Sequence, residues 1–433
     1  MPASPLGSAP SCPCCNFVSG GGLFLPWNEE GGSNDDVGGS TSQDLSLSAH
    51  VIAPREAWDR ILALHRDTNE SHRNILLVDS HGHPHLQREV QYSHDDDDLA
   101  LANAWVISLT CAVSPADWKD ALEYASQSPH ILPALGIHPW YLGDIMIDDI
   151  ENPDNCADIH IEKYISWDWL TDLETHLSEH PRLLVGEIGL CKMARFVREF
   201  PKDKGGKAAA LQLQKLVFSR QMELAARYSR PVTVHCVNAH GIFMEVLWEI
   251  LRKMKDSSAE GGDEKDERKR CRNAFPPAIA MHSFTGTAHH VDEIMAFERA
   301  LLRPEELADA GGKRRRQIQI QQRHESLIEN SDTLRKNAEK DVMFYFGFSH
   351  SVNHLMCTSE KARKRGMDAV RSVPKDRLLV ESDVHASVDV TLGTAGACAY
   401  AAHVRGVSIE DVAKLSVKNG LRFLSSLGSI PSS

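Results

Sequence analysis

Residues 75–85 read ILLVDSHGHPH, a short apolar run that ends in an aspartate and three histidines. Such a run, bounded by polar residues, is typical of a buried strand in a parallel sheet. The same pattern recurs along the chain, with helix-compatible amphipathic stretches between the repeats. The apolar runs cover residues 75–78, 105–109, 131–135, 183–185, 232–234, 278–281, 342–346 and 378–380.

Eight strands that alternate with helices favour a closed (β/α)8 TIM barrel over an open doubly wound sheet. The glycine fingerprint of dinucleotide-binding sheets is also missing after the first run. Helices are expected between the runs, for example over residues 208–228, 241–253, 288–302 and 409–421. Because barrel enzymes keep their chemistry at the carboxyl ends of their strands, the residues that end each run are candidate functional residues.

The domain organisation follows from composition. The chain has 433 residues, of which 42% are hydrophobic and 25% are charged, the balance of a globular protein. Residues 1–50 are rich in Gly, Ser and Pro, and we expect a disordered tail there. Residues 51–433 are expected to form one barrel domain with insertions at 253–276 and 302–340. Both insertions follow a helix and precede a strand, which places them on the face opposite the chemistry.

Charge and cysteine usage narrow the functional classes. The net charge of −13 argues against a whole-chain clamp on nucleic acid. No apolar run reaches the roughly 18–20 residues of a membrane-spanning helix, so no membrane partner is expected. Most of the ten cysteines stand singly, which favours an intracellular, reducing location in the cytoplasm, the nucleus or both.

Two local motifs each have a functional and an ordinary structural interpretation. The cysteines of CPCC at 12–15 have no matching second pair, which disfavours a metal site in the tail. The basic run KRRR at 313–316 has the composition of a nuclear import or nucleic-acid-binding segment. A solvated loop is the more ordinary interpretation of the same residues.

Ligand-type residues end six of the eight runs. In chain order they are His81 and His83, His138, Glu187, His235, His282, and Asp383 together with Glu381. The i, i+2 spacing of His81 and His83 directs both rings to one side of an extended chain. Imidazole and carboxylate ligands suit Zn, Mn or, less comfortably, Mg.

Two divalent ions at this rim would lower the pKa of a bridging water and clamp a phosphoryl group. Glu187 is the carboxylate expected to bridge them, and Asp383 is expected to hold one ion and the nucleophilic water. Asp79 is expected to orient one of the ligands, and His85 is interpreted as a loop residue. Three further histidines near the rim stay unassigned, namely His350, His354 and His385.

These blocks resemble the TatD-type metal-dependent hydrolases, which are nucleases of the wider amidohydrolase-like barrel group. HGH, LGIHP, GEIGL, PVTVH, MHSFTG and ESD occur in the family's order, and NGLRF at 419–423 is similar to its closing motif. The resemblance covers residues 75–425. It implies a TIM barrel, a divalent-metal site and phosphodiester hydrolysis, typically of DNA.

The resemblance also implies roles for individual residues. The metal ligands fall on His81, His83, Glu187, His235, His282 and Asp383, and His138 matches a histidine that contacts a substrate phosphate. A fungal branch of the family, named for interaction with a cell-cycle ubiquitin-ligase subunit, carries similar insertions. It therefore implies a protein partner at the insertions of this chain.

The chain departs from the family pattern at three positions. Cys191 stands where the family has an aspartate, Val237 where it has an arginine, and Ser382 where it has a threonine. The first two replacements remove an acid and a cation that are not metal ligands in the family. We therefore expect them to affect substrate choice and rate more than metal binding.

Three functions stay open from sequence. The first is a metal-dependent phosphodiesterase, for which the resemblance implies deoxyribonuclease activity. The second is an amidase- or lactonase-like hydrolase, although such enzymes often bridge their metals with a modified lysine where this chain has Glu187. The third is an interaction scaffold on a retained metal barrel. Acidic loops at 95–98 and 144–158 should repel a long polyanion, which favours short or single-stranded DNA as the substrate.

Overall fold

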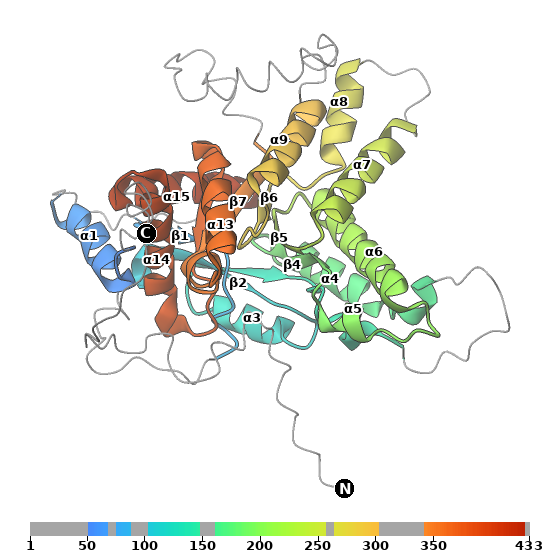
Figure 1. Cartoon of the computed structure of the whole chain (residues 1–433). Coiled ribbons are helices and arrows are strands. Elements are labelled where there is room, and N and C mark those ends of the chain that lie inside the picture. Colours follow the sequence, from blue (N-terminus) through green and yellow to red (C-terminus); the bar gives the residue numbers. More distant parts are fainter. Residues whose placement is uncertain are drawn as a thin grey trace, which may run out of the picture.

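Eight parallel strands form a closed barrel in chain order, with β8 paired to β1 (Figure 1). The computed structural model describes residues 51–67, 75–87, 103–147, 161–256, 264–302 and 342–428. The strands are β1 Leu77–Asp79, β2 Val106–Cys111, β3 Ile131–Leu135, β4 Leu184–Cys191, β5 Val232–Val237, β6 Ile279–Met281, β7 Phe344–Ser349 and β8 Leu378–Glu381. The predicted TIM barrel is confirmed.

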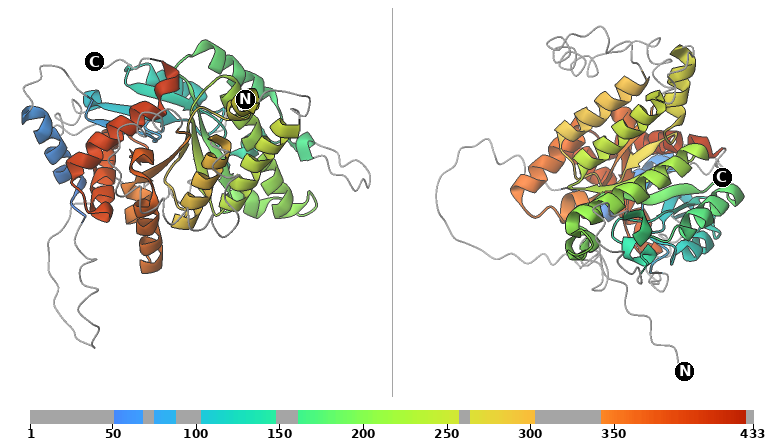
Figure 2. Two further views of the ribbon diagram at one scale, coloured as in Figure 1. Left: turned by 90° about the horizontal axis from the view of Figure 1, so that it is seen from above. Right: turned by 90° about the vertical axis from the view of Figure 1, so that its right-hand side faces the viewer.

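Helices surround the strands, as the two further views show (Figure 2). They are α1 Pro54–Asp67, α3 Trp118–Ala125, α4 Asp168–Glu179, α5 Arg195–Glu199, α6 Gly206–Arg227, α7 His240–Asp256, α8 Glu264–Asn273, α9 Ala288–Leu302, α13 Glu360–Ser372, α14 Val390–Arg405 and α15 Ile409–Phe423. The four helices predicted from sequence are present, with ends that differ by up to three residues. None of the helices in the described part of the chain is long and apolar enough to cross a membrane.

The two expected insertions are only partly described. In the segment 253–276, α7 continues through Asp256, and α8 lies beside α7 and α9 (Figure 1). The tail at 1–50, with its CPCC motif, and all but the first residue of 302–340, with KRRR, lie outside the described residues. So do the acidic residues 95–98 and 148–158.

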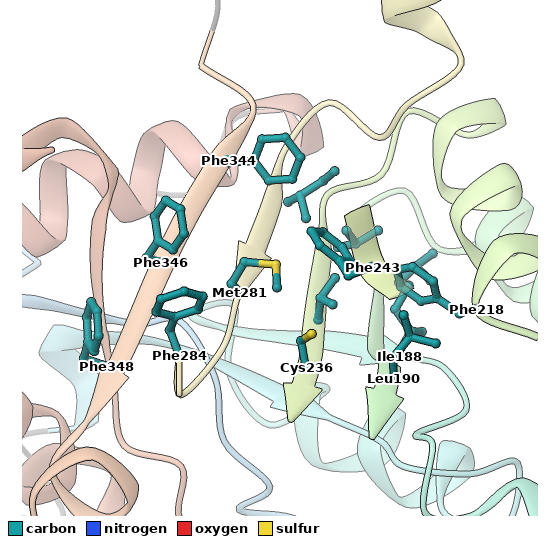
Figure 3. Packing of buried hydrophobic residues seen from close by; sticks show 14 of the residues in the cluster. Ile188, Leu190, Phe218, Cys236, Phe243, Met281, Phe284, Phe344, Phe346 and Phe348 are labelled. Atoms are coloured by element: carbon teal, nitrogen blue, oxygen red, sulfur yellow. The ribbon is translucent and has the colours of Figure 1, made fainter. Parts of the chain in front are cut away.

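Alternation along the strands separates two apolar layers. In β7, which reads FYFGFS, Phe344, Phe346 and Phe348 join the large cluster between barrel and helices (Figure 3). Tyr345 instead joins the smaller cluster inside the barrel. Its ring lies 5.6 Å from that of Phe423 at the end of α15. Apolar side chains therefore fill the barrel interior, and the polar residues gather where the strands end.

Candidate metal centre

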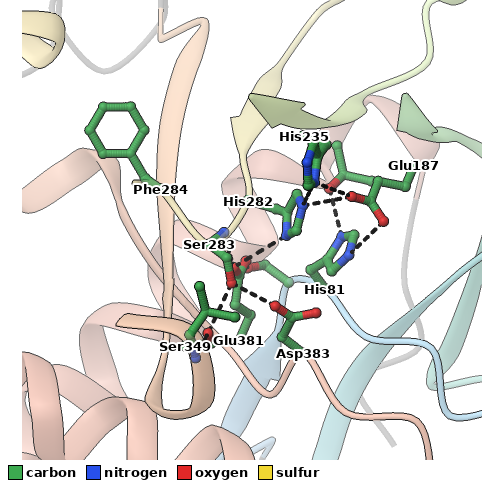
Figure 4. Close-up of polar contacts among 12 residues, drawn as sticks. His81, Glu187, His235, His282, Ser283, Phe284, Ser349, Glu381 and Asp383 are labelled. Atoms are coloured by element: carbon green, nitrogen blue, oxygen red, sulfur yellow. Dashed lines mark hydrogen bonds and ion pairs between the residues drawn. The ribbon is translucent and has the colours of Figure 1, made fainter. Parts of the chain in front are cut away.

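The six predicted ligands and His138 come together at one end of the barrel. Figure 4 shows five of them, namely His81, Glu187, His235, His282 and Asp383. Each of the five histidines and Glu187 is at most 9% exposed, and Asp383 is partly exposed. Such burial of so many polar groups is costly unless they are paired or bind a cation. The described residues contain three sets of side chains at metal-binding spacing within this cluster: His81, His83 and Asp383; His81, Glu187 and His282; and His138, Glu187 and His235.

Glu187 lies at the centre of the cluster and presents its two oxygens to different histidines. Oε2 lies 3.4 Å from Nε2 of His81 and 3.3 Å from Nε2 of His83. Oε1 lies 2.7 Å from Nε2 of His282, 3.0 Å from Nδ1 of His235 and 3.2 Å from Nε2 of His138. This is the arrangement expected of a carboxylate that bridges two cations.

The expected position of Glu187 in its strand needs a correction. It lies inside β4 and not at its end, because Ile188–Cys191 stay paired with β5. The register shifts between Val185 and Ile188, next to Glu187, and such a shift re-aims a side chain. A β-carbon at Gly186 would collide with Thr233, so the small residue lets β5 approach here.

The protonation of His83 follows from its neighbours. Nδ1 lies 2.6 Å from the carbonyl oxygen of Cys111, and a carbonyl can only accept a hydrogen bond. Nδ1 therefore carries a proton, and Nε2 is left to face Nε2 of His81 at 3.3 Å. Two imidazole nitrogens that face each other beside a carboxylate suit a cation held between them.

His138 has the opposite arrangement. Its Nδ1 accepts the backbone N–H of Trp140 at 3.2 Å, so the proton of the neutral ring resides on Nε2. That N–H can donate to Oε1 of Glu187. Burial lowers the pKa of His138 to about 4, so the ring is neutral near pH 7. His138 is thus a hydrogen-bond donor to Glu187, and its contact with a substrate phosphate stays a prediction.

The charges of the cluster favour cation binding. Burial alone would raise the pKa of Glu187, but His138, His282 and His81 hold it well below its usual value. Burial, helped by the nearby His282, lowers the pKa of His81 to about 3. Burial alone would lower the pKa of His83, but Glu187 raises it to about 9. The centre therefore combines an ionised carboxylate and a neutral His81 with a ring at His83 that must lose a proton to bind metal.

Asp383 follows β8 and lies beside the His81–His83 pair. It has a left-handed backbone, with φ of 52°, a conformation that aspartate tolerates better than most residues. Its Oδ2 accepts a hydrogen bond from the hydroxyl of Ser283 at 2.7 Å, and its backbone N–H donates to the carbonyl of His81. The end of β8 is thereby fixed against the ends of β1 and β6.

Sequence reasoning gave no role to four supporting residues, namely Thr233, Ser283, Ser349 and Glu381. Thr233 lies 2.8 Å from Nδ1 of His81, and Ser349 lies 2.9 Å from the Ser283 hydroxyl. Glu381, which was noted but given no role, accepts the backbone N–H of Ser283 and lies 3.8 Å from Nδ1 of His282. Thr233 was detectable from sequence, because i, i+2 spacing puts it on the same side of β5 as His235.

The other residues singled out from sequence lie at different distances from the metal-binding cluster. Asp79 contacts the backbone N–H of His81 and the N–H and hydroxyl of Ser382, so it supports the chain and no ligand ring. His85 bonds to Thr110 and Asp117, away from the cluster. The ring of His385 lies 5.6 Å from that of His83. His350 and His354 stack on each other at 5.2 Å.

The two departures from the family pattern lie next to each other. Cys191 and Val237 are register partners at the ends of β4 and β5. Cys191 is buried, and its backbone N–H and carbonyl both bond to the amide of Gln214. The Cys191 side chain is buried and also lies beside the predicted ligand His235, whose pKa it helps to raise against the effect of burial.

A closed (β/α)8 barrel with a buried His, Glu and Asp cluster at its strand ends is the architecture of a metal-dependent hydrolase. The sequence profile of the TatD related DNase family matches residues 78–300, slightly more than half of the chain. The chain therefore belongs to the TatD related DNase family.

The chain is also similar to individual proteins. The Cut9-interacting protein scn1 of Schizosaccharomyces pombe is 25% identical over 355 residues, which cover 72% of this chain and 88% of that protein. The 3'-5' ssDNA/RNA exonuclease TatD of Musicola paradisiaca is 29% identical over 141 residues, 32% of this chain, and the match spans only 40% of the exonuclease. The crystal structure of a TatD homologue from Escherichia coli superposes with a TM-score of 0.46 and 16% identity, covering 81% of this chain and 98% of the homologue.

Proposed function

We propose that this protein is a divalent-metal-dependent phosphodiester hydrolase that acts on DNA, with short or single-stranded DNA as its substrate. The observation that carries the proposal is the position of Glu187, whose two oxygens face separate sets of imidazole nitrogens. A shared carboxylate between two nitrogen-rich sites is the donor set of a two-metal centre. The name of the bacterial relative supports the single-stranded substrate.

The donor atoms fit two ions of the Zn or Mn type, and Mg less well. His81, His83 and Asp383 would hold one ion, His235 and His282 the other, and Glu187 would bridge them. When bound, such ions lower the pKa of a water molecule and neutralise charge on a phosphate.

The protein's own side chains would supply orientation and proton transfer. Asp383 is held at Oδ2 by Ser283, which leaves Oδ1 to accept the proton of the attacking water. The Nδ1 of His138 accepts from Trp140, so when substrate is bound its Nε2–H would donate to a phosphate oxygen in place of Glu187. Cys191 and Val237, which replace an acid and a cation, leave this rim with fewer charges for holding DNA.

A second function has the support of a relative. The fission yeast relative is named for an interaction with Cut9. We propose that this chain also binds a protein partner, through the insertions at 253–276 and 302–340. Such binding would occur at the face opposite the metal centre and would leave hydrolysis unchanged.

Metal analysis together with a hydrolysis assay tests the first proposal. Purified protein should contain or take up Zn or Mn and should shorten a labelled single-stranded oligonucleotide. Asp383→Asn should lose this activity, by about 10²–10⁴-fold for a group that acts in proton transfer. Asp389→Asn, a nearby carboxylate outside the cluster, is the matched control and should keep it.

The competing functions give different results in the same assay. If the wild-type protein binds metal but cleaves no phosphoester above the Asp383→Asn background, the proposal is wrong. Cleavage of an ester or amide panel by that protein would then indicate the amidase- or lactonase-like alternative. Inactivity on every substrate would leave the interaction scaffold.

A further inference from the structure

A groove with a basic lining lies between the start of α9 and the first turns of α13, two helices that pack against each other. Its volume is about 330 Å³. The lining residues are Thr287, Ala288, His289, Lys361, Lys364, Arg365 and Asp368. Three cations against one carboxylate make this lining positive, and Asp368 is itself paired with Arg371 at 3.3 Å.

The three cations of α13 lie on one face of the helix, where they can bind an anion but do not stabilise the helix. Lys361, Lys364 and Arg365 follow i, i+3, i+4 spacing, so they share one face of the helix. All three are exposed. Within the described ranges, none of them makes an ion pair or hydrogen bond. Unpaired like charges on one helix face repel one another, and a bound polyanion would relieve that repulsion.

Two further histidines, His290 and His240, lie beside the α9 wall of the groove, and burial lowers the pKa of both rings. The backbone N–H of Thr287 donates to Nδ1 of His290 at 3.1 Å, so the neutral ring of His290 carries its proton on Nε2. His240 stacks on His290 with ring centroids 4.2 Å apart. Nε2 of His240 is buried and has no partner among the described residues. Burial, together with His290 and Arg365, lowers the pKa of His240 to about 4.

The start of α9 adds to this environment. α9 has 15 residues and no acidic residue in its first turn. The amino end of a helix carries a partial positive charge, and here no nearby side chain of the first turn offsets it. The groove thus has cations on one wall and a helix amino end on the other.

The groove is close to the metal centre in space. The loop from His282 to Thr287 contains five steps, which span at most about 18 Å. Both helices start at the barrel face where the strands end. Asn353 joins the two loops, since its amide donates to the carbonyl of Phe284 and accepts the backbone N–H of Ser349. The edge of the groove at Thr287 therefore lies within about 18 Å of His282, on the barrel face that holds the metal centre.

We infer that this groove binds the phosphate backbone of a single-stranded nucleic acid whose scissile bond lies at the metal centre. The inference rests on the proposed function, and it adds a second binding site for the same substrate. The groove would also place positive charge at α9 and α13, on the barrel face where acidic loops are expected from sequence. An acidic peptide shares the negative charge but has no reason to extend to a metal centre, so a phosphate chain fits better.

Fluorescence anisotropy with a labelled oligodeoxythymidylate of about 15 nucleotides tests the inference. Every protein in the comparison is full-length and carries Asp383→Asn, so that the probe is not cleaved. The groove variant adds Lys361→Ala, Lys364→Ala and Arg365→Ala. The matched control adds Arg252→Ala, Lys253→Ala and Lys255→Ala, which removes three exposed cations from the far end of α7.

The groove variant should bind the oligonucleotide at least about tenfold more weakly at low salt, and the control should bind as the parent does. The slope of log K against log salt should fall by about 2, because each lost contact to a single strand contributes about 0.7. Thermal unfolding of the groove variant should match the parent, which excludes misfolding as the cause.

Unchanged affinity of the groove variant would overturn the inference, and so would an equal loss in the α7 control. A polyglutamate competitor that displaces the probe as well as unlabelled oligonucleotide does would indicate an acidic-peptide site instead. The proposed function is tested separately by hydrolysis of the small diester bis(p-nitrophenyl) phosphate with the wild-type protein. Hydrolysis without groove binding, or binding without hydrolysis, shows which of the two proposals has failed.

Discussion

The hydroxyl of Thr233 lies 2.8 Å from Nδ1 of His81, on the side of the ring opposite the metal-binding cluster. When Nε2 binds a cation, Nδ1 carries the proton and donates it to Thr233. This contact fixes both the tautomer and the orientation of the ring. Hydrogen-bonding partners of this kind set the affinity of histidine ligands for metal.

Replacing Thr233 by valine should therefore weaken metal binding. Valine keeps the shape but removes the acceptor, and we expect about a 10–100-fold loss of Zn affinity. Competition with a chromogenic chelator measures this affinity. Thr233→Ser keeps the hydroxyl and should retain most of it. A loss in Thr233→Ser with none in Thr233→Val would mean that the methyl group, and not the hydroxyl, is what matters.

The sequence predicted which candidate ligands gather better than it predicted the residues that support them. His81 and His83 were detectable because they follow an apolar run at i, i+2 spacing, a local pattern. The place of Glu187 was not, because a register shift inside β4 is decided by pairing with β5. The contact of Ser283 with Asp383 depends on positive φ angles at both residues, 35° and 52°. Apolar patterns carry no information about such angles.

The same limit applies to protonation. The different roles that we propose for His83 and His138 depend on the groups that face their Nδ1 atoms. One faces the carbonyl of Cys111, and the other faces the backbone N–H of Trp140. The first partner comes from another strand, so only the folded chain defines it. The tail and KRRR lie outside the described residues, and their expected roles stay predictions.

Ser283→Ala should slow hydrolysis by about tenfold or more, because Asp383 loses the donor that orients it. Ser283 also helps to lower the pKa of Asp383, and a lost hydrogen bond to the charged form raises that pKa. The acid limb of the rate profile should therefore move to higher pH. Rates measured across pH with bis(p-nitrophenyl) phosphate check both effects. A lower rate with an unmoved acid limb would mean that Ser283 supports the position of the backbone but does not affect the pKa of Asp383.

Removal of metal should destabilise the folded protein. The cluster is buried, and the bound ions stabilise the native state by about 4 kcal/mol when free metal is 1,000-fold above Kd. Treatment with a chelator should lower the melting temperature by several degrees, and added Zn or Mn should restore it. Glu187→Gln should show little response to either treatment. A wild-type melting temperature that is insensitive to metal would argue against the whole centre.

A buried ion pair should control stability at a distance from the metal centre. Arg377, just before β8, bonds to both oxygens of Glu298 on α9, at 2.8 and 2.9 Å. Glu298 also accepts hydrogen bonds from the backbone N–H groups of Met343 and Phe344. It therefore links α9 to β7 and, through Arg377, to the start of β8. Both residues are buried, with at most 9% of their surface exposed.

Glu298→Ala should lower the free energy of unfolding by about 3–5 kcal/mol, because it leaves the Arg377 cation buried and unpaired. The matched control is Glu174→Ala, which removes the partner of Arg227 from an exposed pair and should cost at most about 1 kcal/mol. Urea unfolding followed by circular dichroism measures both. The double variant Glu298→Ala/Arg377→Met should lose less than the two single losses added together, since no unpaired charge is left. Strict additivity would show that Glu298 stabilises the barrel through Met343 and Phe344 alone.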